Sequence, residues 1–163
     1  MALSLEIFRD LPVQSIAAGA IVIDQGTRTG RLFILISGKV EIVKDGKSVA
    51  TSGQQGDIFG DLSALLDVPH TTSVRAVTDS QFYVVTEARP FLEQNPVVCM
   101  HLCELLARRL VSVTDYLVNL KQQFAGHDHL GMVDEVLDKL IHRHPRPRIP
   151  ARQSTTALPE IPD

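Results

Sequence analysis

The chain has 163 residues, of which 44% are hydrophobic and 21% are charged, and its formal net charge is −3 at pH 7. This composition is typical of an ordinary soluble globular protein with one domain and short additions. The negative net charge does not favour DNA binding, and no apolar run approaches the roughly 18 residues that cross a bilayer, so we expect neither DNA nor a membrane as a partner. The first residues lack the pattern of a signal peptide, so we expect a cytoplasmic protein.

A short helix is expected within residues 1–11, and a β-rich domain is expected over residues 12–90. Eight of the ten glycines lie between Gly19 and Gly60, where they mark turns between short strands. Asp45-Gly46 is a strong hairpin signal because both residues tolerate positive φ. Short strands separated by glycine turns indicate a small barrel or jelly roll. The predicted strands cover residues 20–23, 32–36, 40–43, 73–77 and 81–85.

Residues 59–76 form the most informative stretch, because a glycine-led turn, a short apolar helix and a hydroxyl-rich run follow one another. The turn and helix start are Phe59, Gly60, Asp61, Leu62 and Ser63. After Pro69 come His70, Thr71, Thr72 and Ser73, and then an extended run. N–H groups at a helix start and the helix dipole both favour negative charge, so this stretch is a candidate anion site.

A long helix is expected over residues 95–125, because Asn95-Pro96 favours a helix start and residues 97–124 contain neither Gly nor Pro. Apolar residues recur at alternating spacings of four and three, which predicts a coiled-coil pair and hence a homodimer. The alternative is one helix that covers a face of the barrel, and Leu102, Leu105 and Val118 widen the apolar stripe in its favour. The seam consists of Cys99, Cys103, Leu106, Leu110, Val113, Leu117, Leu120 and Phe124.

A short amphipathic helix is expected within residues 129–144, with its apolar positions between Met132 and His142, and a proline-rich disordered tail over residues 145–163. The histidines at 127, 129, 142 and 144 lack a standard ligand spacing, so no metal site is predicted. Cys99 and Cys103 are interpreted as small apolar residues on the seam. No catalytic motif is present, so no enzyme activity and no cofactor are expected.

Taken in order, these features resemble the cyclic nucleotide-binding domains of the catabolite activator protein and of protein kinase A regulatory subunits. The run from Leu32 to Ile42 is similar to that family's strand pair around a glycine turn, and Gln55 to Asp61 is similar to the start of its phosphate-binding cassette. The resemblance covers about half of the chain. It implies a mostly β fold with flanking helices, a cyclic nucleotide-binding-type jelly roll followed by a long C-terminal helix.

The resemblance also implies ligand roles, with cAMP or cGMP as the candidate ligand. Asp61 stands where the family has a glutamate for the ribose 2′-hydroxyl, and His70 stands where it has an arginine for the cyclic phosphate. Thr71 takes the hydroxyl position, while Gly60, Leu62 and Thr72 would offer backbone donors. A lost charge-assisted hydrogen bond costs about 1.5–3 kcal/mol, so binding weakened by roughly 10- to 100-fold is expected. Phosphate favours protonated His70, which predicts tighter binding at pH 6 than at pH 8.

Two functions therefore stay open on the sequence. The first is a cyclic-nucleotide sensor module, and the second is a ligand-free interaction and dimerisation module. About 40 residues follow Phe124, which is too few for a helix-turn-helix output domain. Under either reading we expect the module to act by contacting a protein partner that the sequence does not name.

Overall fold

The computed structural model describes residues 4–123 and 131–142. It divides into two compact units, residues 1–108 and residues 109–163, and the division falls within a single long helix. The two units are described separately.

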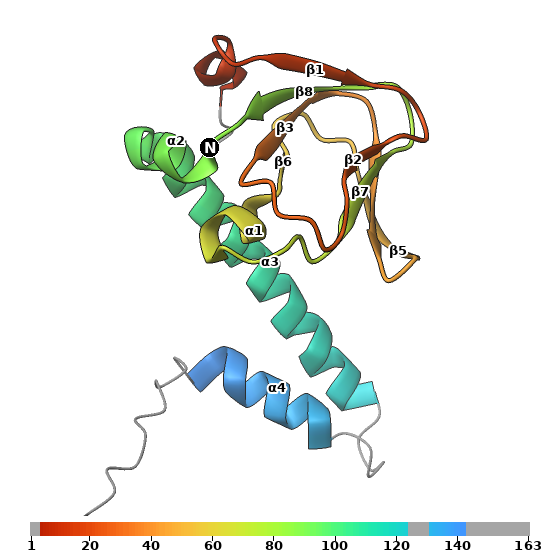
Figure 1. The fold of residues 1–163 in the computed structure, drawn as a ribbon. Coiled ribbons are helices and arrows are strands. Elements are labelled where there is room, and N and C mark those ends of the chain that lie inside the picture. The colour runs from red at the N-terminus through yellow and green to blue at the C-terminus, as the bar shows by residue number, and fades with distance from the viewer. Residues whose placement is uncertain (1–3, 124–130, 143–163) are drawn as a thin grey trace, which may run out of the picture. The chain divides into compact units, whose positions relative to one another are not determined.

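The first unit is built on two four-stranded antiparallel sheets, with strand orders β1-β8-β3-β6 and β2-β7-β4-β5 (Figure 1). This arrangement confirms the predicted jelly roll. In chain order the strands are β1 (Val13–Ile16), β2 (Ile21–Ile23), β3 (Leu32–Ser37), β4 (Val40–Lys44), β5 (Lys47–Ser52), β6 (Ile58–Phe59), β7 (Ser73–Ala76) and β8 (Ser80–Val85).

The predicted strands all form, and the expected hairpin joins β4 to β5. Its turn has positive φ at Asp45 (50°) and Gly46 (77°), as the residue types require. Strands β1 and β6 were not predicted. Three of the four residues of β1 are exposed, and β6 has only two residues, so neither carries a period-two apolar pattern.

The apolar run of β3 is continuous because both faces of its sheet are covered. Phe33 and Leu35 point into the space between the sheets, while Leu32 and Ile34 pack under the helices. Phe82 of β8 is fully buried and centres the inter-sheet core. Its ring lies edge-on to Phe33, with centroids 6.1 Å apart, and to Phe59, with centroids 6.5 Å apart.

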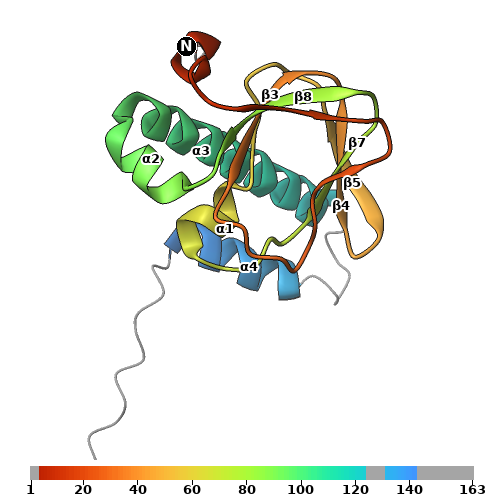
Figure 2. The same ribbon diagram turned by 45° about the horizontal axis from the view of Figure 1, so that its top comes forward.

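Three helical segments cover the outer face of the β1-β8-β3-β6 sheet: η1 (Leu5–Phe8), α2 (Ala88–Gln94) and the first part of α3 (Pro96–Gln123) (Figure 2). Val98 and Leu102 of α3 are buried in this second core. The N-terminal helix lies within the predicted range of residues 1–11, at Leu5–Phe8. It is one 3-10 turn, which buries Phe8 completely and ends before exposed Arg9 and Asp10.

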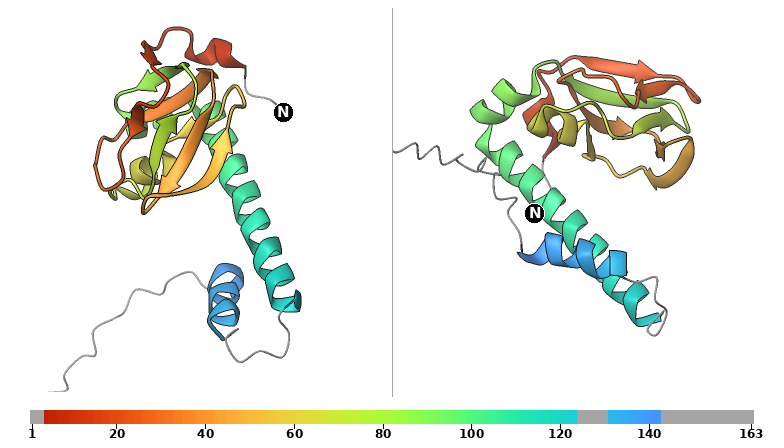
Figure 3. Two further views of the ribbon diagram at one scale, coloured as in Figure 1. Left: turned by 90° about the vertical axis from the view of Figure 1, so that its right-hand side faces the viewer. Right: turned by 60° about the horizontal axis from the view of Figure 1, so that its bottom comes forward.

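The second unit contains the end of α3 and α4 (Gly131–His142) (Figure 3). Lys121 of α3 forms an ion pair with Asp134 of α4, and Leu137 of α4 is buried. Within the described ranges, no helix is both long and apolar enough to cross a membrane. Phe124 of the predicted seam, the histidine pair at 127 and 129, and the proline-rich tail lie outside the described residues.

Candidate functional site

Gly60 forms the turn between β6 and the six-residue helix α1 (Asp61–Leu66). Its φ of 89° and ψ of 2° lie in the left-handed region, which residues with a Cβ seldom adopt. A Cβ placed on Gly60 would lie 2.5 Å from the carbonyl oxygen of Arg31, at the start of β3. The turn is therefore pressed against the neighbouring backbone, and only glycine fits there.

The first turn of α1 carries three of the predicted cassette residues. Asp61 is 6% exposed, so its carboxylate is held at the positive end of the helix and is not free in solvent. Leu62 is 40% exposed. The hydroxyl of Ser63 donates to the carbonyl of Val68 at 2.6 Å, which closes the segment that follows α1. The Ser63 hydroxyl thus has a structural role.

His70 is 5% exposed and is bound to the loop of residues 24–31 by three hydrogen bonds. Its backbone N–H donates to the Thr27 carbonyl at 2.8 Å, and its carbonyl accepts from the Gly26 N–H at 2.8 Å. Its Nε2 lies 2.8 Å from the hydroxyl oxygen of Thr29. Burial lowers the pKa of His70 below its ordinary value, because it disfavours the charged ring.

The structure also brings the two ends of the cassette together. Cε1 of His70 lies 3.6 Å from the point where a Cβ on Gly60 would be. Nine residues separate these positions in the sequence, and the loop of residues 24–31 holds them against each other. The sequence pattern predicted both residues, but it gave no sign that Thr27 and Thr29 would anchor the histidine.

The three hydroxyl residues after His70 differ in their surroundings. Thr71 is exposed and Thr72 is half-buried. The Ser73 hydroxyl accepts from the Gln25 N–H at 2.9 Å and donates to the Asp24 carboxylate at 3.4 Å. Ser73 therefore fastens β7 to the loop that also holds His70.

Arg75, two residues after Ser73, forms an ion pair with Glu41. Its Nε donates to Oε1 of Glu41 at 2.6 Å, across the paired strands β7 and β4. The hydrogen bond from Arg75 lowers the pKa of Glu41. Arg75 is thereby engaged with Glu41 on the sheet that contains β4 and β7.

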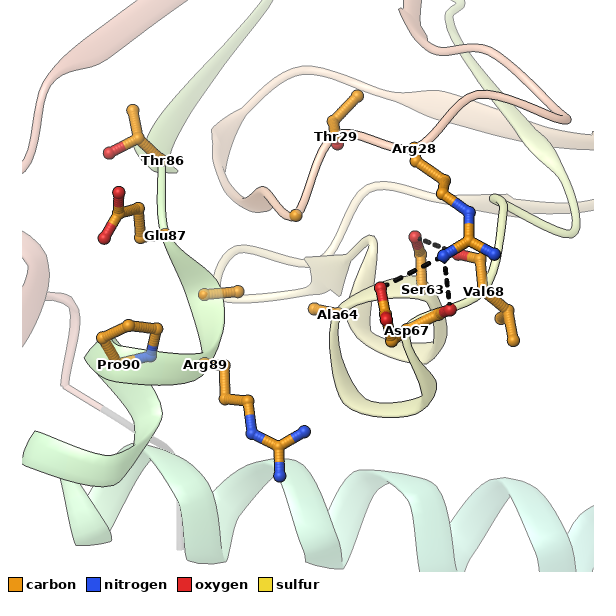
Figure 4. A pocket seen from close by; sticks show the side chains of 12 residues that line it. Arg28, Thr29, Ser63, Ala64, Asp67, Val68, Thr86, Glu87, Arg89 and Pro90 are labelled. Atoms are coloured by element: carbon orange, nitrogen blue, oxygen red, sulfur yellow. Dashed lines mark hydrogen bonds and ion pairs between the residues drawn. The ribbon is translucent and has the colours of Figure 1, made fainter.

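A cavity of about 530 Å³ lies on the side of α1 that faces α2 (Figure 4). Arg28 lines it and donates from Nη1 to the Asp67 carbonyl at 2.7 Å and to the Asp67 carboxylate at 3.2 Å. Sequence reasoning did not single out Arg28, since an arginine in a loop without a motif carries no signal. None of residues 70–73 lines this cavity.

The seam residues of α3 have unequal exposure. Leu106 packs partly against the core under the helices, so the barrel uses part of the seam. Cys103 is exposed, and Cys99, Leu117 and Leu120 are half-buried. Leu110 is 46% exposed and Val113 is 50% exposed, which leaves an apolar strip on the second unit.

Among the described residues, no group of three or more His, Cys, Asp and Glu side chains is arranged to hold a metal ion. The segment combines a tight glycine turn, a buried carboxylate on the next residue and an imidazole beside the turn. A comparison with known proteins identifies the family of the chain segment that contains this site. The family model described as "Cyclic nucleotide-binding domain" matches residues 13–92. Residues 13–92 belong to this family.

The relatives of this cyclic nucleotide-binding domain include regulatory proteins, an effector protein and enzymes. The chain is 32% identical over 134 residues to the Pycsar effector protein XpPycTIR of Xanthomonas perforans, covering 77% of this chain and 44% of that protein. The chain thus spans less than half the length of this curated relative.

Two solved structures share the fold. The structure of cAMP-bound PfPKA-R has a TM-score of 0.54 and 26% identity, covering 68% of this chain and 37% of that one. The catabolite activator protein of Thermus thermophilus has a TM-score of 0.56 and 22% identity, covering 83% and 78%.

Proposed function

We propose that this chain is a regulatory module that binds a cyclic nucleotide, with cAMP and cGMP as the candidates, at residues 59–73. The observation that carries the proposal is the packing of His70 beside the Gly60 turn, with the buried carboxylate of Asp61 next to it. This grouping unites the two ends of the cassette in a chain segment whose family is defined by cyclic nucleotide binding.

In this proposal, Asp61 accepts a hydrogen bond from the ribose and His70 donates one to the cyclic phosphate. Thr71 supplies a hydroxyl, and the backbone N–H groups of Gly60, Leu62 and Thr72 complete the phosphate shell. Binding is weak, because an imidazole lacks the paired donors and the permanent charge of a guanidinium. Ligand binding then shifts the equilibrium between two conformations of the module, to the extent that the ligand binds one of them more tightly than the other.

The affinity rises as the pH falls, since a bound phosphate favours the protonated imidazole. Burial lowers the pKa of His70 in the free protein, so the rise extends to pH values below the ordinary range of a histidine. The sequence analysis also expects tighter binding at lower pH. Burial of His70 shifts the pH range of this rise in affinity toward acid.

The test is isothermal titration of nucleotide-stripped protein with cAMP and cGMP, using the His70→Arg variant beside wild type. Restoring a guanidinium at this position is expected to tighten binding by roughly 10- to 100-fold. His101→Arg places the same substitution on α3, away from the cassette, and is expected to bind like wild type. If neither wild type nor a folded His70→Arg variant binds at millimolar nucleotide, the proposed ligand class is wrong.

A second candidate function is favoured by the exposed strip on α3. Leu110 and Val113 present apolar surface at seam spacing, which suits a homodimer or a protein partner. Leu110→Asp is expected to lower the solution mass of a dimer, measured by analytical ultracentrifugation. Val111→Asp is the matched control, because Val111 is 59% exposed and points about 100° away around the helix. If Leu110→Asp leaves the solution mass unchanged, the seam does not mediate self-association.

The same protein could bind a nucleotide and form a dimer, so the two measurements are made independently. A module that dimerises without binding nucleotide would be a ligand-free interaction module. A module that binds nucleotide would be a sensor, acting in the cytoplasm through a partner of unknown identity.

A further inference from the structure

The hydroxyl of Thr29 lies within hydrogen-bond distance of two neighbouring groups. Its oxygen accepts from the backbone N–H of Arg31 at 3.3 Å and lies 2.8 Å from Nε2 of His70. A hydroxyl has one proton and two lone pairs, so with one lone pair taken by the Arg31 N–H it can either donate to Nε2 or accept from it. Donation to Nε2 gives the hydroxyl proton a partner and leaves the ring N–H on Nδ1. A neutral imidazole that accepts at Nε2 carries its proton on Nδ1.

The other ring nitrogen of His70 lies at the accessible edge of the ring. Within residues 4–123 and 131–142, Nδ1 makes no hydrogen bond, yet every fully buried side-chain nitrogen or oxygen has a partner. Nδ1 therefore belongs to the small accessible part of a side chain that is only 5% exposed. An N–H at this position is available to an incoming ligand.

We propose that Thr29 is a positioning residue for His70: its hydroxyl donates to Nε2 and holds the neutral ring as the Nδ1–H tautomer, whose N–H donates to the phosphate of the bound nucleotide. This inference rests on the proposed function. It explains how a neutral histidine can donate a hydrogen bond to an anion. The opposite tautomer would turn the lone pair of Nδ1 toward the phosphate.

The proposal makes the role of Thr29 depend on pH. In a protonated ring both nitrogens carry a proton, so Nδ1–H is present whatever Thr29 does. Thr29 therefore matters when His70 is neutral and loses its effect when His70 is charged. The ionisable groups around the ring are Asp24, Arg28 and Arg31 of the loop, Asp61 of α1, and Asp67 directly after α1.

The chain offers matched variants for this test. Thr29→Val removes the hydroxyl at constant shape, and Thr29→Ser restores it. Thr27→Val removes a hydroxyl from the same loop, where it donates to the Asp24 carbonyl at 2.7 Å and not to the ring. The first measurement is the nitrogen-15 spectrum of the imidazole in nucleotide-free protein at pH 8. Wild type, Thr29→Ser and Thr27→Val should show the Nδ1–H tautomer, and Thr29→Val should show a shift toward Nε2–H.

The second measurement is titration with cAMP and cGMP at pH 8 and pH 5. Thr29→Val is expected to weaken binding by about 2- to 10-fold at pH 8, and this loss should shrink at pH 5. A wild-type Nε2–H tautomer, or a loss that is equal at both pH values, overturns the proposal. If wild type binds neither nucleotide, the proposed function fails, while the nitrogen-15 spectra still decide whether Thr29 sets the tautomer.

Discussion

Replacing Gly60 with alanine tests whether the cassette turn is pressed against β3 as the structure shows. The change adds a Cβ to a residue with φ of 89°, and a left-handed conformation costs a residue with a Cβ roughly 1–2 kcal/mol. The added atom would also lie 2.5 Å from the Arg31 carbonyl oxygen, so two backbone segments must separate. Overpacking of this kind adds about 1–3 kcal/mol. The expected loss in free energy of unfolding is therefore about 2–5 kcal/mol.

Gly19→Ala is the matched control. Gly19 has φ of 84°, yet nothing lies within 4 Å of its added Cβ, so the variant keeps the conformational cost and lacks the collision. Urea unfolding of wild type and both variants gives the two free energies. Gly60→Ala should be less stable than Gly19→Ala by about 1–3 kcal/mol. Equal losses in the two variants would refute the close approach, and with it the positioning of the cassette by the start of β3.

Three further predictions concern the core and two titrating groups. Phe82→Ala should lower the free energy of unfolding by about 3–5 kcal/mol, against less than about 0.5 kcal/mol for the exposed Val49→Ala, in the same urea assay. The folded pKa of His70 is lowered below the unfolded value, so the unfolded chain takes up the proton first and stability falls as the pH drops below about 6.5. The free energies of unfolding at pH 7.5 and pH 5.5 should therefore differ less in His70→Gln than in wild type. An equal difference in the two proteins would show that His70 does not cause the loss of stability in acid. The Arg75 hydrogen bond lowers the pKa of Glu41, so the stability from this pair is present above the unfolded pKa of Glu41 and is lost as acid protonates the carboxylate. Arg75→Met should therefore lower the free energy of unfolding slightly at pH 7 and leave it unchanged at pH 2–3, and a loss that persists in acid would contradict the ion pair.

The strands that could be predicted from the sequence are those whose own residues show an apolar run or a turn signal. The runs at 32–36 and 81–85 are apolar because helices cover the outer face of their sheet, and Asp45-Gly46 supplies the positive φ of a tight hairpin. By contrast, β1 and β6 form because partner strands β8 and β3 lie beside them. Their own residues show no pattern, so pairing between distant segments decided these two elements.

The candidate site divides in the same way. Gly60 and His70 could be singled out because a turn, a helix start and a hydroxyl run follow one another along the chain. The anchoring of His70 by Thr27 and Thr29 could not be predicted, since these residues precede it by 43 and 41 positions and carry no motif. The same holds for Ser63 and Ser73, which the sequence suggested as ligand groups and whose hydroxyls bind protein partners.

The most direct test of the account is an NMR titration of backbone amides in nitrogen-15-labelled, nucleotide-free protein with cAMP and cGMP, with AMP as the acyclic control. The account predicts saturable shifts from at least one cyclic nucleotide at residues 60–63 and 70–73, with the exposed strand β5 unaffected. Shifts that are absent at millimolar nucleotide, or that leave the cassette unaffected, would contradict the claim that this cassette binds a cyclic nucleotide.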